Sequence, residues 1–341
     1  MTQPPTFAVI SGAQVHDAVA GREAEVTRTV EAAYRLHGEG LTVNPDSYFL
    51  RFPDRPSDRI IALPASVKGD VGVHGIKWIS SFPGNVANGI PRASAVLILN
   101  DAETGYPFAC LESSIISAAR TAASAALAAA ALADARGPRP RRVGFVGAGL
   151  IARYIHTYLA GNGFAFDELG VHDLSREHAE GFKGYLERSA KGDITIHESA
   201  ESLIRSSDLV VFATVAGEPH VPDPGWFAHA PLVLHVSLRD LSPEVILSSC
   251  NVVDDVEHCM KANTSPHLAE QQTGNRDFVD GTLYDVLTGR TTPPAGKPVV
   301  FSPFGLGVLD LAVAKYVYDQ VSTSGALTTV PDFFHEMKRY G

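Results

Sequence analysis

The stretch Val143-Gly144-Phe145-Val146-Gly147-Ala148-Gly149-Leu150-Ile151-Ala152 decides how the rest of this sequence is interpreted. An apolar run leads into the pattern G-x-G-x-x-A and a helical pattern follows, which is the context in which these glycines bind a dinucleotide. Gly147 allows the tight turn, Gly149 lets the backbone approach a pyrophosphate, and Ala152 permits close packing of helix against strand. Unpaired N–H groups at the helix start would bind the phosphates. The cofactor-binding residues expected here are Gly147, Ala148, Gly149, Leu150 and Ile151.

A second strand-like run ends in Asp173, 24 residues after Gly149. A carboxylate at this place accepts hydrogen bonds from ribose hydroxyls and repels a 2′-phosphate, so it predicts NAD as the cofactor. Arg176 leaves some use of NADP open, and Asp173 has an alternative role as a cap of the next helix. Thr214, after a later strand, is either a further cofactor contact or an ordinary strand-end hydroxyl.

Short apolar runs and helical patterns alternate around this turn. Strands are expected at 143–146, 169–171, 194–196, 209–213, 233–236 and 251–253, and helices at 150–159 and 176–188. Alternation at this spacing predicts an α/β fold, a Rossmann-type doubly wound parallel sheet with helices on both faces.

The first 110 residues have a different pattern, which predicts an α+β domain. A helix is expected at 23–37 and strands at 48–52, 59–63, 71–79 and 95–100, with a hairpin over 95–110. An alanine-rich helix from about 112 to 135 joins the two regions, and a last helix at 305–320 returns to the first. The expected domains are 1–120 with the return of 311–341, and an NAD-binding domain over 121–310.

The composition limits the possible partners and compartments. The chain has 341 residues and a net charge of −10, which disfavours binding to nucleic acid or to an anionic membrane. Its three cysteines are too few and too scattered for a disulfide framework, and its 13 histidines show no metal-ligand spacing, so no metal is expected. With no signal-peptide pattern and an apolar run, 125–133, too short to span a bilayer, we expect a cytoplasmic protein.

Four cationic residues stand out against this acidic background: Arg51, Lys77, Arg92 and Arg120. Lys77 lies inside an apolar strand pattern, and Arg120 interrupts an apolar helix face, where a charge needs an anionic partner. Each alone is equally explained as a solvated residue or a structural ion pair. Together they predict a pocket for carboxylates, since Arg offers a bidentate fork and Lys a point charge.

Asp240 follows the strand expected at 233–236, and ligands of such sheets bind beyond the carboxyl ends of the strands. This places Asp240 and Arg239 near the nicotinamide, where Asp240 could move a proton. The alternative is that Asp240 caps the helix after Ser242-Pro243. The polar segment 258–271 is either a lid or a surface loop, and the sequence does not separate the two.

Several motifs, in order, resemble the ornithine cyclodeaminase/μ-crystallin family over about Arg51 to Ala314. They are Arg51, Ile76-Lys77, Thr104-Gly105-Tyr106-Pro107, Ala119-Arg120-Thr121-Ala122-Ala123, Val146-Gly147-Ala148-Gly149, Asp240 and Phe304-Gly305-Leu306-Gly307-Val308-Leu309-Asp310. The resemblance implies a homodimer built through the first domain and hydride transfer at the α-carbon of an amino acid. It also implies that Arg51, Lys77 and Arg120 hold the substrate α-carboxylate, with Asp240 and Lys77 as catalytic residues.

Departures from the cyclodeaminases resemble one branch of the family. Ile61 stands where they have Glu, Arg92 where they have a small neutral residue, and Leu238-Arg239 where they have Gly-Gly. With 60–65, 75–83, 91–95 and 237–240, these residues are similar to the N-[(2S)-2-amino-2-carboxyethyl]-L-glutamate dehydrogenases of 2,3-diaminopropionate biosynthesis. Additional arginines suit a substrate with three carboxylates, so Arg92 and Arg239 are expected to bind the remaining two.

This branch implies NAD-dependent oxidative cleavage of a C–N bond, with Asp240 activating the water that attacks the imine. The products would be 2,3-diaminopropionate and 2-oxoglutarate, serving a siderophore or a peptide antibiotic, with a PLP-dependent synthase supplying the substrate. Three alternatives stay open: an ornithine cyclodeaminase, an NAD-dependent alanine dehydrogenase or imine reductase, and a non-catalytic μ-crystallin-like ligand binder.

Overall fold

The computed structural model describes residues 5–335 and 337, and its chain divides into two compact units. Unit 1 comprises Met1–Arg120 and Leu306–Gly341, and unit 2 comprises Thr121–Gly305. The boundary after Arg120 falls inside the helix α3 (Ser114–Arg136). The C-terminal part of unit 1 begins at Leu306, earlier than the expected 311, because the helix α11 (Gly307–Thr323) packs on the sheet of unit 1 from its first turns.

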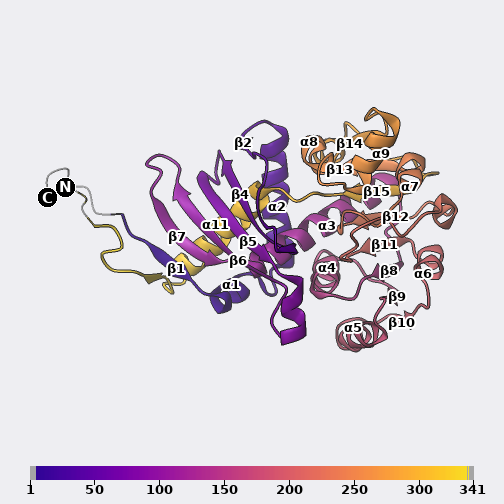
Figure 1. Cartoon of the computed structure of the whole chain (residues 1–341), viewed down its shortest axis with the longest axis horizontal. Helices are drawn as coiled ribbons and strands as arrows, with labels where there is room; N and C mark the ends of the chain where they lie inside the picture. The colour runs from indigo at the N-terminus through magenta and orange to yellow at the C-terminus, as the bar shows by residue number, and fades with distance from the viewer. Residues whose placement is uncertain (1–4, 336, 338–341) are drawn as a thin grey trace. The chain divides into compact units, whose positions relative to one another are not determined.

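Unit 1 is built on an eight-stranded sheet in the order β16-β1-β7-β6-β5-β4-β2, with β3 also paired to β4. The strand β1 is parallel to β7, and the other pairs are antiparallel. In Figure 1 the helix α11 lies along this sheet, where it packs on β4, β5 and β6, and α2 packs on α11. The elements are β1 (Ala8–Ile10), α1 (Gly12–Val19), α2 (Glu23–Gly38), β2 (Thr42–Val43), β3 (Tyr48–Phe52), β4 (Arg55–Val67), β5 (Val73–Ser81), η1 (Pro83–Asn88), β6 (Ala93–Asp101), β7 (Pro107–Glu112), α11 and β16 (Thr328–Thr329).

The two faces of this sheet differ in polarity and exposure. Residues directly opposite in neighbouring strands share a face. The face against α11 contains Lys77 together with the buried Leu97 and Leu99. The opposite face, here called the outer face, exposes large apolar side chains: Val9, Tyr48, Leu50, Trp78 and Val96.

Unit 2 is an eight-stranded sheet in the order β10-β9-β8-β11-β12-β15-β13-β14, and all its pairs are parallel. The chain order reverses between β8 and β11, which is the switch point where such sheets bind ligands. The expected α/β class with a doubly wound parallel sheet is confirmed. The elements are β8 (Arg142–Val146), α4 (Leu150–Gly161), β9 (Glu168–His172), α5 (Arg176–Ser189), β10 (Asp193–Ile196), α6 (Ala200–Ser206), β11 (Leu209–Phe212), η2 (Pro224–Phe227), β12 (Leu232–His235), α7 (Pro243–Ser248), β13 (Cys250–Val253), α8 (Val256–Cys259), α9 (Ser265–Thr273), β14 (Val279–Thr282), α10 (Leu283–Leu287) and β15 (Val299–Ser302).

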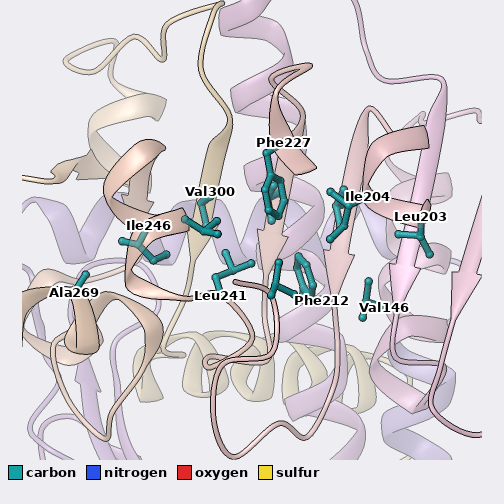
Figure 2. Close-up of a cluster of buried hydrophobic side chains, with 13 residues drawn as sticks. Val146, Leu203, Ile204, Phe212, Phe227, Leu241, Ile246, Ala269 and Val300 are labelled. Carbon is teal, nitrogen blue, oxygen red and sulfur yellow. The ribbon is translucent and has the colours of Figure 1, made fainter. Parts of the chain in front are cut away.

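Helices cover both faces of the second sheet because its strands are apolar on both sides. On one face, the cluster of Figure 2 joins strand residues such as Val146 and Phe212 to Leu203, Phe227 and Ile246 from α6, η2 and α7. On the other face, Phe145 contacts the rings of Phe182 on α5 and His156 on α4. Burial on both faces holds the carboxyl ends of the strands, and the loops that follow them, in fixed register.

The alanine-rich helix α3 extends well beyond the apolar run 125–133, which alone is too short to span a bilayer. Its 23 residues have a mean hydropathy of 1.5 over the best window, so by length and composition it could cross a bilayer. However, 67% of that window is buried inside the protein, and the core helix of a soluble protein passes the same test.

Candidate active site

The turn between β8 and α4 has the geometry that its glycines predict. Gly147 has φ +93°, and a Cβ added there would lie 2.6 Å from the carbonyl oxygen of Ala213. Gly149 has an extended backbone conformation (φ −85°, ψ −172°) and is the N-cap of α4. A Cβ added at Gly149 would meet nothing within 4 Å, so its surroundings are open space. Only glycine fits at Gly147, whereas Gly149 leaves room beside the backbone for a ligand.

The start of α4 lacks the side-chain cap that most helices of unit 2 have. Ser, Thr or Asp side chains accept from first-turn N–H groups at the starts of α5, α6, α7, α8, α9 and α10. Among the residues that the structure describes, no side chain caps the first turn of α4, where Leu150 is exposed and Ile151 half-buried. Orphan N–H groups at an uncapped, open helix start fit the pyrophosphate of a dinucleotide. Ala152 is fully buried, as the close packing of helix on strand requires.

Asp173 lies beside this turn, at the end of β9. Its Oδ2 accepts from the backbone N–H of Ala148 at 2.9 Å, and its Oδ1 accepts from that of Ser175 at 2.8 Å. The cap of α5 is Ser175, so the alternative role of Asp173 as that cap is wrong. Arg176 forms ion pairs with Glu180 at 2.7 Å and Glu198 at 3.4 Å, so two carboxylates already neutralise this arginine.

Asp240 follows β12 and is fully buried, with hydrogen-bonding groups around its carboxylate. Thr214 Oγ1 and Ser237 Oγ each donate to it at 2.5 Å, and His220 Nε2 lies 3.0 Å from Oδ1. Thr214, after β11, therefore contacts Asp240, and its hydroxyl also accepts from the N–H of Ala216 at 3.1 Å. The cap of α7 is Ser242, so the alternative role of Asp240 as that cap is wrong.

His235 and His220 give this carboxylate an environment that the sequence did not reveal. His235 is fully buried, and its Nε2 lies 3.3 Å from Asp240 Oδ2. Burial alone would raise the pKa of Asp240, but the hydrogen bonds to His220 and Ser237 and the neighbouring ring of His235 outweigh it and hold that pKa well below its ordinary value. His235 Nε2 itself accepts from the backbone N–H of Asp240 at 3.1 Å. These contacts therefore favour the charged form of Asp240. Neither histidine belongs to a recognisable motif, so only the fold could bring them to it.

In unit 1, Lys77 and Arg120 meet on one carboxylate, that of Asp310 in α11. Lys77 Nζ lies 2.7 Å from Asp310 Oδ2, and Arg120 Nε lies 3.1 Å from Oδ1. Lys77 and Asp310 are buried, and burial lowers the pKa of Lys77 to about 8 although Asp310 opposes the shift. Lys77 and Arg120 each form an ion pair with Asp310. Because two cations face one carboxylate, the group keeps a net positive charge. Asp310 ends the motif Phe304–Asp310 that resembles the family, and the sequence analysis assigned it no role.

Arg51 and Arg92 lie farther along the same face of the sheet as Lys77. Arg51 is opposite Arg59, Arg59 is opposite Ser81, and Ser81 stands four residues after Lys77 on β5, so their side chains share a face. Arg92 donates to Ser81 Oγ at 2.9 Å, and the Arg51 guanidinium lies 4.9 Å from the Phe49 ring centre. The four-residue spacing between Lys77 and Ser81 corresponds to roughly 13 Å along the strand. Arg59 is an additional cation that the sequence analysis missed.

Arg239 connects the loop of Asp240 to the segment 258–271. Its Nε and Nη2 donate to the carbonyl oxygen of Ala262 at 3.1 and 2.6 Å, and the N–H of Ser265 donates to the carbonyl of Leu238 at 2.8 Å. Three non-glycine residues on these two loops have left-handed φ, namely Leu238 (+78°), Ala262 (+56°) and Asn263 (+52°). Such backbone is unfavourable for residues with a Cβ, so packing between the two loops stabilises it.

A parallel sheet with an open, uncapped helix start at its switch point defines a dinucleotide-binding protein. A sequence profile of the ornithine cyclodeaminase/mu-crystallin family matches residues 13–325. The N-((2S)-2-amino-2-carboxyethyl)-L-glutamate dehydrogenase of Staphylococcus aureus is 28% identical over 284 residues, or 80% of this chain and 82% of that protein. The chain belongs to the ornithine cyclodeaminase/mu-crystallin family.

Two solved structures share the fold over almost the full chain. The crystal structure of CmnK is 31% identical, with a TM-score of 0.85 over 97% of this chain and 100% of that one. A structure of an archaeal alanine dehydrogenase dimer with bound NAD is 25% identical, with a TM-score of 0.85 over 96% and 100%. The expected family and fold are confirmed.

Proposed function

We propose that this chain is an NAD-dependent oxidoreductase that cleaves N-[(2S)-2-amino-2-carboxyethyl]-L-glutamate into 2,3-diaminopropionate and 2-oxoglutarate. The supporting observation is the row of cations on one face of the sheet of unit 1: Arg51, Lys77, Arg92 and Arg120, with one carboxylate, Asp310, between two of them. An excess of positive charge on a partly buried face suits a substrate with three carboxylates. The similarity to the Staphylococcus aureus dehydrogenase supports the same substrate.

The residues of unit 2 supply the cofactor site in this proposal. The turn Gly147–Ile151 and the open start of α4 bind the pyrophosphate, and Asp173 accepts from the ribose hydroxyls. Bound NAD⁺ supplies the hydride acceptor. An alanine dehydrogenase of the same fold, solved with NAD bound, supports this cofactor.

The residues of unit 1 orient the substrate. Arg51, Lys77 and Arg120 hold the α-carboxylate, and Arg92 binds a further carboxylate. The reaction begins at the neutral secondary amine, whose glutamyl Cα–H bond breaks with its electron pair leaving as hydride. The nitrogen lone pair forms the C=N bond, so the substrate loses two electrons, which bound NAD⁺ would accept with the hydride. Water then adds to the carbon, and the C–N bond breaks with its electrons on nitrogen.

The biological setting follows from these products. We propose a cytoplasmic enzyme that acts after a PLP-dependent synthase and serves siderophore or peptide-antibiotic biosynthesis. We also propose a homodimer formed through unit 1, as the dimeric state of the alanine dehydrogenase of the same fold supports.

Incubation of the purified protein with NAD⁺ and the proposed substrate tests this function. NADH, 2,3-diaminopropionate and 2-oxoglutarate should appear in equal amounts, and omission of the substrate is the control. An NAD-dependent alanine dehydrogenase is the second candidate, supported by the structural similarity to that enzyme. NADH formed with alanine but not with the three-carboxylate compound would overturn the proposal in favour of this candidate.

A further inference from the structure

The environment of Asp240 makes it a poor proton acceptor. Its side chain is fully buried, and both carboxylate oxygens are occupied by Thr214, Ser237 and His220, with His235 close to Oδ2. A carboxylate that accepts several hydrogen bonds is stabilised in its charged form, so protonating it costs free energy. Because the side chain is fully buried, water reaches this carboxylate only if neighbouring groups move.

His220 has the opposite properties. Its backbone N–H and that of Val221 donate to the carbonyl of Asp240 at 3.0 and 2.9 Å, which fixes the residue beside the loop after β12. Its Nε2 lies 3.0 Å from Asp240 Oδ1, while its side chain is 40% exposed. Within residues 5–335 and 337, no side chain or backbone group forms a hydrogen bond with its Nδ1.

A half-exposed histidine with one nitrogen on a buried carboxylate, and the other without a hydrogen-bond partner among the described residues, is arranged for proton transfer. Because Asp240 is a carboxylate, Nε2 carries a proton toward it, which leaves Nδ1 of the neutral ring as the acceptor. The carboxylate orients the ring and stabilises the imidazolium, as in catalytic histidine–carboxylate pairs. His235 cannot act in this way, since it is fully buried and its Nδ1 lies 3.1 Å from Ser302 Oγ.

We propose that His220 is the proton-transfer residue of the C–N cleavage and that Asp240 is its positioning residue. This rests on the proposed function and replaces the expected role of Asp240 as the group that activates water. Water adds to the protonated imine carbon and gives one proton to Nδ1, and the imidazolium passes it to the nitrogen. The C–N bond then breaks with its electrons on nitrogen. The hydroxyl proton leaves through the imidazole to the released amine, so a ketone and an ammonium group result and His220 is again neutral.

The variant His220→Gln tests this role, because the glutamine amide can still donate to Asp240 but cannot accept a proton. Stopped-flow measurement of NADH should show a burst of about one equivalent per site at a rate close to that of the wild type. Steady-state release of 2-oxoglutarate should fall by at least about 100-fold, the usual contribution of a general acid–base group. In His220→Ala, added imidazole should restore part of the steady-state rate.

The controls separate this role from the proposed function itself. His197→Gln removes another half-exposed histidine of unit 2, bonded to Ser202 at 3.0 Å, and should leave both phases unchanged. Normal steady-state turnover in His220→Gln, with NADH formed, would overturn the role of His220 but keep the proposed function. Loss of the NADH burst in His220→Gln, together with no recovery of the His220→Ala rate by imidazole, would also overturn the role of His220 and keep the proposed function. If the wild-type protein forms no NADH from the substrate, the proposed function fails and the role of His220 with it.

Discussion

At the scale of single residues, the charge of Lys77 depends on its burial against Asp310. The pKa of Lys77 is lowered from 10.5 to about 8, mainly by burial, so its ammonium group loses its proton as the pH rises through about 8. If Lys77 holds a substrate carboxylate, kcat/KM should fall above pH 8, measured as a pH profile with saturating NAD⁺. The unfolded chain binds more protons at this residue between pH 8 and 10.5, so Lys77 makes folding more favourable as the pH rises across this window. The fall is therefore not explained by unfolding.

Asp310→Asn extends this test, because Asp310 raises the pKa of Lys77. Without that carboxylate, the fall in kcat/KM should move to lower pH. A fall at the same pH in both proteins would show that a group other than Lys77 titrates. Unfolding measured by circular dichroism is the control, since an uncompensated buried cation costs about 3–5 kcal/mol.

The single carboxylate of Asp173 is expected to select NAD over NADP. It lies beside the N–H of Ala148, where it would repel a 2′-phosphate. Direct titration should show tighter binding of NAD than of NADP, and Asp173→Ala should reduce that preference at least about tenfold. A wild-type protein that prefers NADP would refute this assignment.

Arg92 and Arg239 are the residues expected to distinguish a three-carboxylate substrate from a simpler amino acid. Removing one partner of a desolvated charge pair costs about 2–5 kcal/mol, so Arg92→Ala or Arg239→Ala should lower kcat/KM at least about thirtyfold. NAD affinity should change little. Arg205→Ala, which removes a surface pair with Glu201 on α6, is the matched control. Unchanged kcat/KM in both variants would leave the proposed substrate supported by similarity alone.

At the scale of elements, the two glycines of the turn between β8 and α4 should affect stability and cofactor binding differently. Gly147→Ala adds a Cβ 2.6 Å from the carbonyl of Ala213 at a positive φ, so both stability and NAD affinity should decrease. Gly149→Ala adds a Cβ where nothing lies within 4 Å, so the melting temperature should stay within a few degrees. Its NAD affinity should still fall, because the methyl group occupies the space expected for the pyrophosphate. Equal NAD binding by Gly149→Ala and the wild type would place the cofactor elsewhere.

Most elements were predictable because their patterns are local. The helix expected at 23–37 is α2, and the strands expected around the glycine turn are β8, β9, β10, β11, β12 and β13. The strand β15 was missed, although it lies between β12 and β13. Its apolar run Val299–Phe301 is short and follows a Pro- and Gly-rich segment, so it carries no periodicity of its own.

At the scale of the whole molecule, the outer face of the sheet of unit 1 is the expected dimer interface. Trp78 and Val96 are opposite each other on β5 and β6 and are 42% and 45% exposed. Large apolar side chains gathered on one face favour association. In size-exclusion chromatography with light scattering, the wild type should therefore elute as the proposed homodimer and Trp78→Lys as a monomer. Leu247→Lys, on the exposed side of α7, should leave the dimer intact. A dimer that persists in Trp78→Lys would place the interface on another surface.

The parallel sheet and the glycine turn could be predicted from local patterns, because strand periodicity, turn glycines and the carboxylate of Asp173 act within short segments. The sequence also indicated which cations to examine, since Lys77 and Arg120 interrupt apolar patterns. The partners of these charged residues could not be predicted in this way. Asp310 lies 233 residues from Lys77 and 190 from Arg120, and His220 lies 20 residues from Asp240. Contacts over such separations depend on how helices and strands pack, and they decide which charged group is held in place and which can exchange a proton.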